Sequence, residues 1–109
     1  MTKHRAEDCA KIARLCGLKG VIVHRIGDGF YCYHVPRGES NEYCFDPFGQ
    51  DADAMMVQRK LKLTVGWIFC NKEWRAEARD QPISRLDKSL RAAICACALA
   101  IAEAKEGKE

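Results

Sequence analysis

Cysteine and histidine are the residue types in this chain with the most evident chemistry, and one of each lies close together. Cys32 and His34 would share one face of a strand over residues 30–35, because side chains alternate along a strand. Cys44 or Cys70 could complete a tetrahedral metal site from neighbouring strands. Cys32 could instead act as a nucleophile beside an imidazole. A small metal or thiol enzyme is therefore one alternative.

Neither chemistry is accompanied by the local sequence pattern that it usually has. Structural zinc ligands commonly come as Cys-x-x-Cys pairs, which the chain lacks. Cys95 and Cys97 lie in a predicted helix, where residues two apart diverge by about 200 degrees. The glycines around Asp28 lack the Lys-Ser/Thr pair and the following helix of a phosphate loop. We therefore predict no catalytic residue, no metal ligand and no cofactor, and most of the seven cysteines as small buried hydrophobes.

Aromatic and basic side chains alternate in a predicted hairpin and return in a later strand, which favours a binding role. Such rings can stack on unpaired bases. However, 18 basic and 15 acidic residues give a net charge of only +3, less than a dedicated nucleic-acid module usually carries. A protein partner is thus favoured, and nucleic acid stays an alternative. The candidate binding surface comprises Arg25, Tyr31, Tyr33, His34, Arg37, Trp74 and Arg75.

Three helices are expected to position these residues. Apolar residues recur at helical spacing over residues 2–17, and again from Asp51 to Lys62, where acidic residues begin the segment and basic residues end it. The last helix is predicted to open at Pro82, with Ser84–Asp87 as an N-terminal capping box, and to end before Gly107.

The predicted strands fall into two hairpins. Residues 21–23 and 30–35 form the first around the Gly-Asp-Gly turn, and residues 42–45 add a short third strand. Residues 63–70 are apolar on both faces, which indicates a central strand. Residues 73–79 alternate with charges, which indicates an edge strand with one wet face.

The whole chain is expected to form one domain, residues 1–109. It has 48% hydrophobic and 30% charged residues, and this length suffices for one modest core. No apolar run reaches about 18 residues, so no membrane partner is expected. The first eight residues turn acidic where a secretory signal would be apolar, which predicts a cytoplasmic location.

Two stretches resemble a known family. Phe45-Asp46-Pro47-Phe48 leads through an Asp-Ala-Asp-Ala helix start, and residues 90–100 read Leu-Arg-Ala-Ala-Ile-Cys-Ala-Cys-Ala-Leu-Ala. Together they resemble the phage ABA sandwich domain family of small phage and prophage proteins. The resemblance implies an α+β fold, a three-layer α/β/α sandwich around one antiparallel sheet of about four strands. This agrees with the element order α-β-β-α-β-β-α, and the resemblance brings no catalytic residues.

These observations lead to one leading expectation about function. The chain is expected to be a small non-enzymatic phage or prophage accessory protein in the host cytoplasm, where it binds a protein partner such as a host or host-defence factor. The alanine-rich last helix leaves a homodimer open, because small residues allow close helix packing.

Overall fold

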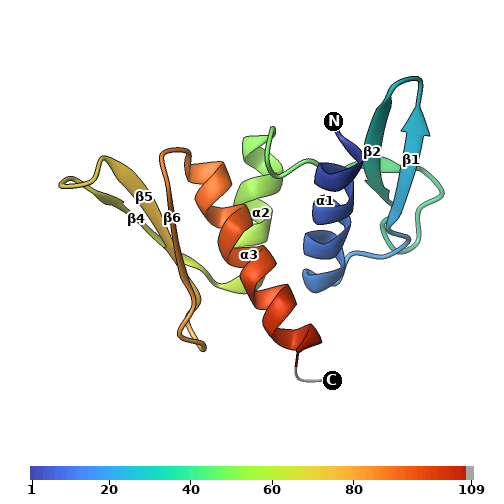
Figure 1. The fold of residues 1–109 in the computed structure, drawn as a ribbon. Coiled ribbons are helices and arrows are strands. Elements are labelled where there is room, and N and C mark those ends of the chain that lie inside the picture. The colour runs from blue at the N-terminus through green and yellow to red at the C-terminus, as the bar shows by residue number, and fades with distance from the viewer. Residues whose placement is uncertain (108–109) are drawn as a thin grey trace. The chain divides into compact units, whose positions relative to one another are not determined.

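The computed structural model describes residues 1–107, which contain three helices and six strands (Figure 1). The chain divides into two compact units, Met1–Asp46 and Pro47–Glu109, and each unit has its own three-stranded antiparallel sheet. The elements of the first unit are α1 (Lys3–Leu15), β1 (Ile22–Ile26), β2 (Gly29–His34) and β3 (Tyr43–Cys44). Those of the second are α2 (Asp51–Leu61), β4 (Thr64–Ile68), β5 (Glu73–Glu77), β6 (Ser84–Asp87) and α3 (Leu90–Glu106).

Helix α1 forms where the apolar spacing predicts it. Thr2 caps its N-terminus, because the hydroxyl oxygen accepts a hydrogen bond of 3.1 Å from the backbone N–H of Arg5. The predicted apolar face is buried at Cys9, Ile12 and Ala13. Helix α1 packs against both strands of the β1–β2 hairpin.

The β1–β2 hairpin has a two-residue turn. Ile26 pairs with Gly29, and Gly27 takes a positive φ of 61° while Asp28 does not. A positive φ at the first central position is the type II′ arrangement, which suits the twist of antiparallel strands and favours glycine there. The predicted third strand, β3, is confirmed and pairs with β2.

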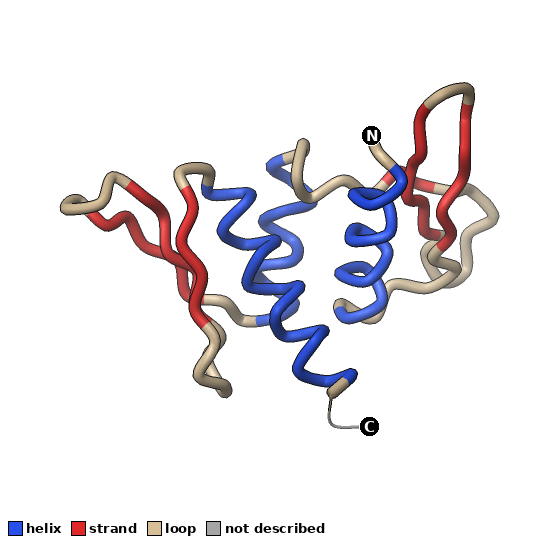
Figure 2. The backbone as a smooth tube through the Cα atoms, viewed as in Figure 1, coloured by secondary structure: helices blue, strands red, loops and turns tan. Residues whose placement is uncertain are grey.

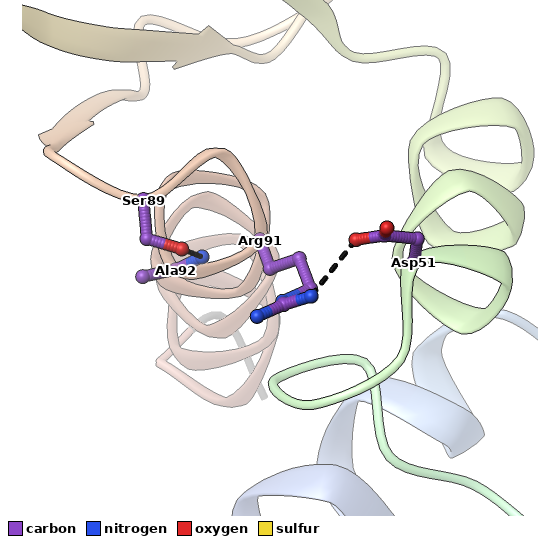
Figure 3. Close-up of polar contacts among 4 residues, drawn as sticks. All are labelled: Asp51, Ser89, Arg91 and Ala92. Atoms are coloured by element: carbon purple, nitrogen blue, oxygen red, sulfur yellow. Dashed lines mark hydrogen bonds and ion pairs between the residues drawn. The ribbon is translucent and has the colours of Figure 1, made fainter.

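In the second unit, α2 and α3 pack side by side with their N-termini at the same end (Figure 3). The Arg91 guanidinium in the first turn of α3 lies 2.9 Å from the carboxylate of Asp51, the first residue of α2. Small side chains on α3 permit close packing. Its completely buried residues are Ala93, Ile94, Cys95, Cys97 and Ala98.

The second sheet has the order β4-β5-β6, and α3 packs on β5 and β6 (Figure 2). Two sequence predictions are wrong here. Residues 63–70 do not form a central strand, since β4 lies at the edge, and residues 73–79 do not form an edge strand, since β5 is central. The physical reason is β6: Ser84–Asp87 pairs with β5 instead of beginning the last helix.

The α+β class and the three helices of the prediction are confirmed. The predicted order α-β-β-α-β-β-α matches roughly, since one more strand follows each hairpin, but the single sheet of about four strands is wrong. Alternating hydrophobicity predicts that a segment is a strand, but not which hairpin it joins. In the described residues each hairpin takes its third strand from the segment that follows it, β3 or β6, so two separate sheets result. The single-domain assignment of residues 1–109 stays a prediction.

Candidate binding surface

The strand register divides the first sheet into two faces. Ile22 pairs with Tyr33, which also pairs with Cys44 on the other side. Directly opposed residues of antiparallel strands place their side chains on the same face. The side chains at alternate positions of β1 and β2 lie on this face as well. We call this surface the aromatic face, and it consists of Ile22, His24, Ile26, Tyr31, Tyr33 and Cys44.

The opposite face of the sheet packs against α1. It carries Cys32, whose side chain is completely buried, together with Val23, to which Cys32 is directly opposed. Helix α1 is the helix of this unit, and it contacts both β1 and β2 (Figure 1). The aromatic face therefore points away from α1, and no helix or strand of residues 1–46 covers it.

The aromatic face is apolar with one polar edge. Ile22 is 42% exposed and Ile26 is 54% exposed, which is high for large aliphatic side chains. The His24 ring stands edge-on to the Tyr33 ring, with 5.4 Å between the ring centroids. The Nε2 atom of His24 lies 3.5 Å from a carboxylate oxygen of Glu42. The surface is thus an exposed apolar platform with a carboxylate at its edge.

The structure brings together only part of the predicted hairpin surface. Tyr31 and Tyr33 share the aromatic face, but Arg25 and His34 belong to the opposite face by register. The Arg25 Nε donates a hydrogen bond of 3.4 Å to the Gly27 carbonyl and so supports the turn. The connection after β2 holds Arg37, which is exposed.

His34 has aromatic neighbours on its own side of the sheet. Its ring centroid lies 6.2 Å from that of Phe45, which is completely buried, and 6.1 Å from that of Tyr43. Tyr43 is also held by the Glu39 carboxylate, which accepts a hydrogen bond from its hydroxyl and repels its phenolate. Both effects raise the pKa of Tyr43 above its ordinary value. His34 therefore belongs to this aromatic group rather than to the aromatic face.

The other two predicted residues lie in the second sheet, on opposite faces of β5. Trp74 is directly opposed to Trp67, and their ring centroids are 5.4 Å apart in an edge-on arrangement. Ala76 shares this face and is completely buried, so the tryptophan pair lies on the side that α3 covers. Arg75 points to the other face, where its Nε lies 3.0 Å from the Glu77 carboxylate.

The strand register also shows whether the cysteines and histidine of the metal or thiol enzyme alternative lie together. Cys32 and His34 share the face toward α1, but Cys44 lies on the aromatic face, so the three side chains do not converge. Within residues 1–107, no three His, Cys, Asp or Glu side chains lie close enough to share a metal ion.

Most of the seven cysteines are buried, as predicted. Cys44 and Cys70 are the exposed ones. Burial raises the pKa of the Cys97 thiol, because the thiolate would lose its hydration. The buried cysteines are Cys9, Cys16, Cys32, Cys95 and Cys97.

Sequence reasoning missed the aliphatic half of the aromatic face. Ile22, His24 and Ile26 were not predicted as surface residues, nor was Trp67 as the partner of Trp74. The signal was present in the Gly-Asp turn: a two-residue loop fixes the pairing of Ile26 with Gly29 and hence every other pair in the hairpin.

No protein-family model matches the sequence, and no curated protein matches it significantly. Among the residues that the structure describes, no helix has both the length and the apolar character needed to cross a bilayer.

Proposed function

We propose that this protein acts by binding a protein partner through the aromatic face, as a non-enzymatic accessory protein of a phage or prophage. The observation that carries the proposal is the exposure of Ile22 and Ile26 beside Tyr31 and Tyr33 on a face that no element of residues 1–46 covers. Contiguous exposed apolar surface with aromatic residues is typical of protein interfaces. The phage assignment rests on the sequence resemblance.

Electrostatics favours a protein over a nucleic acid as the partner. Binding of single strands combines stacked aromatic rings with basic groups that track the phosphates. On the aromatic face the rings stand beside the Glu42 carboxylate, which would repel phosphates, and Arg25 belongs to the opposite face. The basic side chain of Arg25 therefore does not lie beside Tyr31 and Tyr33.

The test is capture of the partner by tagged full-length protein from its natural host cells, with nuclease treatment and comparison of two variants. Ile26→Glu places a charge on the aromatic face, where Ile26 is 54% exposed. Leu86→Glu is the matched control, because Leu86 is 45% exposed on a strand of the second sheet. Burying an unpaired carboxylate in an interface is costly.

We expect the wild type and Leu86→Glu to retain the same protein after nuclease treatment, and Ile26→Glu to lose it. Circular dichroism should show both variants folded, since each replaces an exposed side chain. Equal retention by both variants would place the interface elsewhere. Recovery that disappears with nuclease would favour the nucleic-acid alternative.

A further inference from the structure

Strand β4 presents an unprotected edge. It lies at the end of the β4-β5-β6 sheet and pairs with β5 on one side only, and within the described residues no other strand pairs with its second side. The outward backbone N–H and C=O groups of such a strand form a template for another extended strand. This edge can therefore accept a further strand.

The composition of this edge distinguishes it from the others. Nine consecutive residues, 63–71, carry no charge, and they include the exposed aromatic residues Trp67 and Phe69, of which Phe69 is 83% exposed. Proteins usually protect free edges with charges or with very short strands. The other sheet edges have such protection: β6 carries Arg85 and Asp87, β1 carries Arg25, and β3 has two residues.

We propose that β4 pairs with β4 of a second copy of this chain, antiparallel and centred on Gly66, to form a six-stranded sheet across a two-fold axis. This dimer is independent of the proposed partner site on the aromatic face. A two-fold axis at Gly66 uses the whole strand, because Gly66 is the middle residue of Thr64–Ile68. The same patch on both copies is the usual geometry of a homodimer.

The sequence of β4 is complementary to itself in this register. Trp67 of one copy opposes Val65 of the other, and pairs of aromatic and β-branched residues are favourable cross-strand neighbours. Thr64 opposes Ile68, and Gly66 opposes Gly66 without side chains to clash. No like charges meet along the strand, so electrostatic repulsion does not oppose the pairing.

The helices leave this edge accessible. Helix α3 packs on β5 and β6 rather than on β4, and the turn of the β4–β5 hairpin projects away from α2 and α3 (Figure 1). A second β4 can therefore approach in the plane of the sheet. Pairing would also reduce the exposure of Trp67, which is 38% exposed in the single chain.

The test uses two substitutions at Gly66 that differ only in charge. Gly66 has no positive φ, and no atom lies within 4 Å of the position a Cβ would occupy, so either side chain fits. In Gly66→Glu the carboxylate stands opposite Arg75 within the hairpin but opposite its own copy across the two-fold axis. Gly66→Gln has nearly the same size without the charge.

Sedimentation over a concentration series should show a dimer for the wild type and for Gly66→Gln. Dimerisation of Gly66→Glu should be weaker by on the order of tenfold or more, because like charges would face each other at the axis. Hydrogen exchange of wild-type residues 63–70 should slow as concentration rises, which requires no variant. A monomeric wild type, an unweakened Gly66→Glu dimer, or unchanged exchange in β4 would each overturn the proposal.

Discussion

At the residue scale, the burial of each cysteine side chain determines how readily its thiol can react. Cys97 is completely buried, and burial raises its pKa, so both access and the thiolate fraction are low. Cys44 and Cys70 are exposed. We predict that a soluble alkylating reagent modifies these two residues first in the native protein, and the five buried cysteines only after denaturation.

Peptide mapping by mass spectrometry over a time course would measure this order, with the denatured protein as the control for intrinsic reactivity. Rapid native modification of Cys32 would show that the hairpin opens from α1, and would contradict the packing of its face. It would also restore the thiol alternative.

Individual residue roles on the hairpin were only partly predictable from sequence. Tyr31 and Tyr33 share a face because they are two apart in a strand, and the sequence is sufficient for that conclusion. The same rule places His34 on the face of Cys32, yet composition alone grouped it with the tyrosines. The types of the side chains indicate what kind of partner could bind. The alternation of side chains along a strand determines which residues lie on one face and can contact that partner together.

At the element scale, the start of α3 depends on a cap rather than on an ion pair. The Ser89 hydroxyl accepts a hydrogen bond of 3.3 Å from the backbone N–H of Ala92 (Figure 3). We predict that Ser89→Ala lowers the free energy of unfolding by about 1 kcal/mol, the usual cost of a lost N-cap. Chemical denaturation followed by tryptophan fluorescence would measure the change.

Arg91→Gln is the matched comparison, two residues further along the same helix. It removes the exposed pair with Asp51, but it also removes a positive charge from an N-terminal turn, where the helix dipole disfavours one. These effects oppose each other, so the change should stay within about 0.5 kcal/mol. A larger loss for Arg91→Gln than for Ser89→Ala would contradict this ranking.

The same region shows why one element could not be predicted. Ser84 and Asp87 have the spacing of a capping box, which predicts a helix start. In the structure they lie in β6, and the Asp87 carboxylate instead accepts a hydrogen bond from the Ser89 backbone N–H just before the helix. The polar pattern therefore places the helix start too early, at Pro82 instead of Leu90. The pattern cannot show that Ser84–Asp87 pairs with β5, because this pairing is a tertiary interaction.

At the scale of the whole molecule, tyrosine and tryptophan signals allow the unfolding of the two compact units to be followed separately. The three tyrosines, at positions 31, 33 and 43, lie in Met1–Asp46, and both tryptophans, at positions 67 and 74, lie in Pro47–Glu109. If the chain is one domain, denaturation followed by tyrosine absorbance and by tryptophan fluorescence should give coincident transitions. This is our expectation, since a 46-residue unit alone would bury little apolar surface. Two separate midpoints would contradict it.

We propose that the aromatic face binds a protein, and this can be tested directly in cells. The most direct measurement is photocrosslinking in the natural host cells, with a photoreactive phenylalanine derivative in place of Ile26 and, as a control, in place of Leu86. We predict a discrete, nuclease-resistant crosslinked protein from position 26 and none from position 86. The same crosslinks from both positions, nucleic acid at position 26, or no crosslink there would contradict the account.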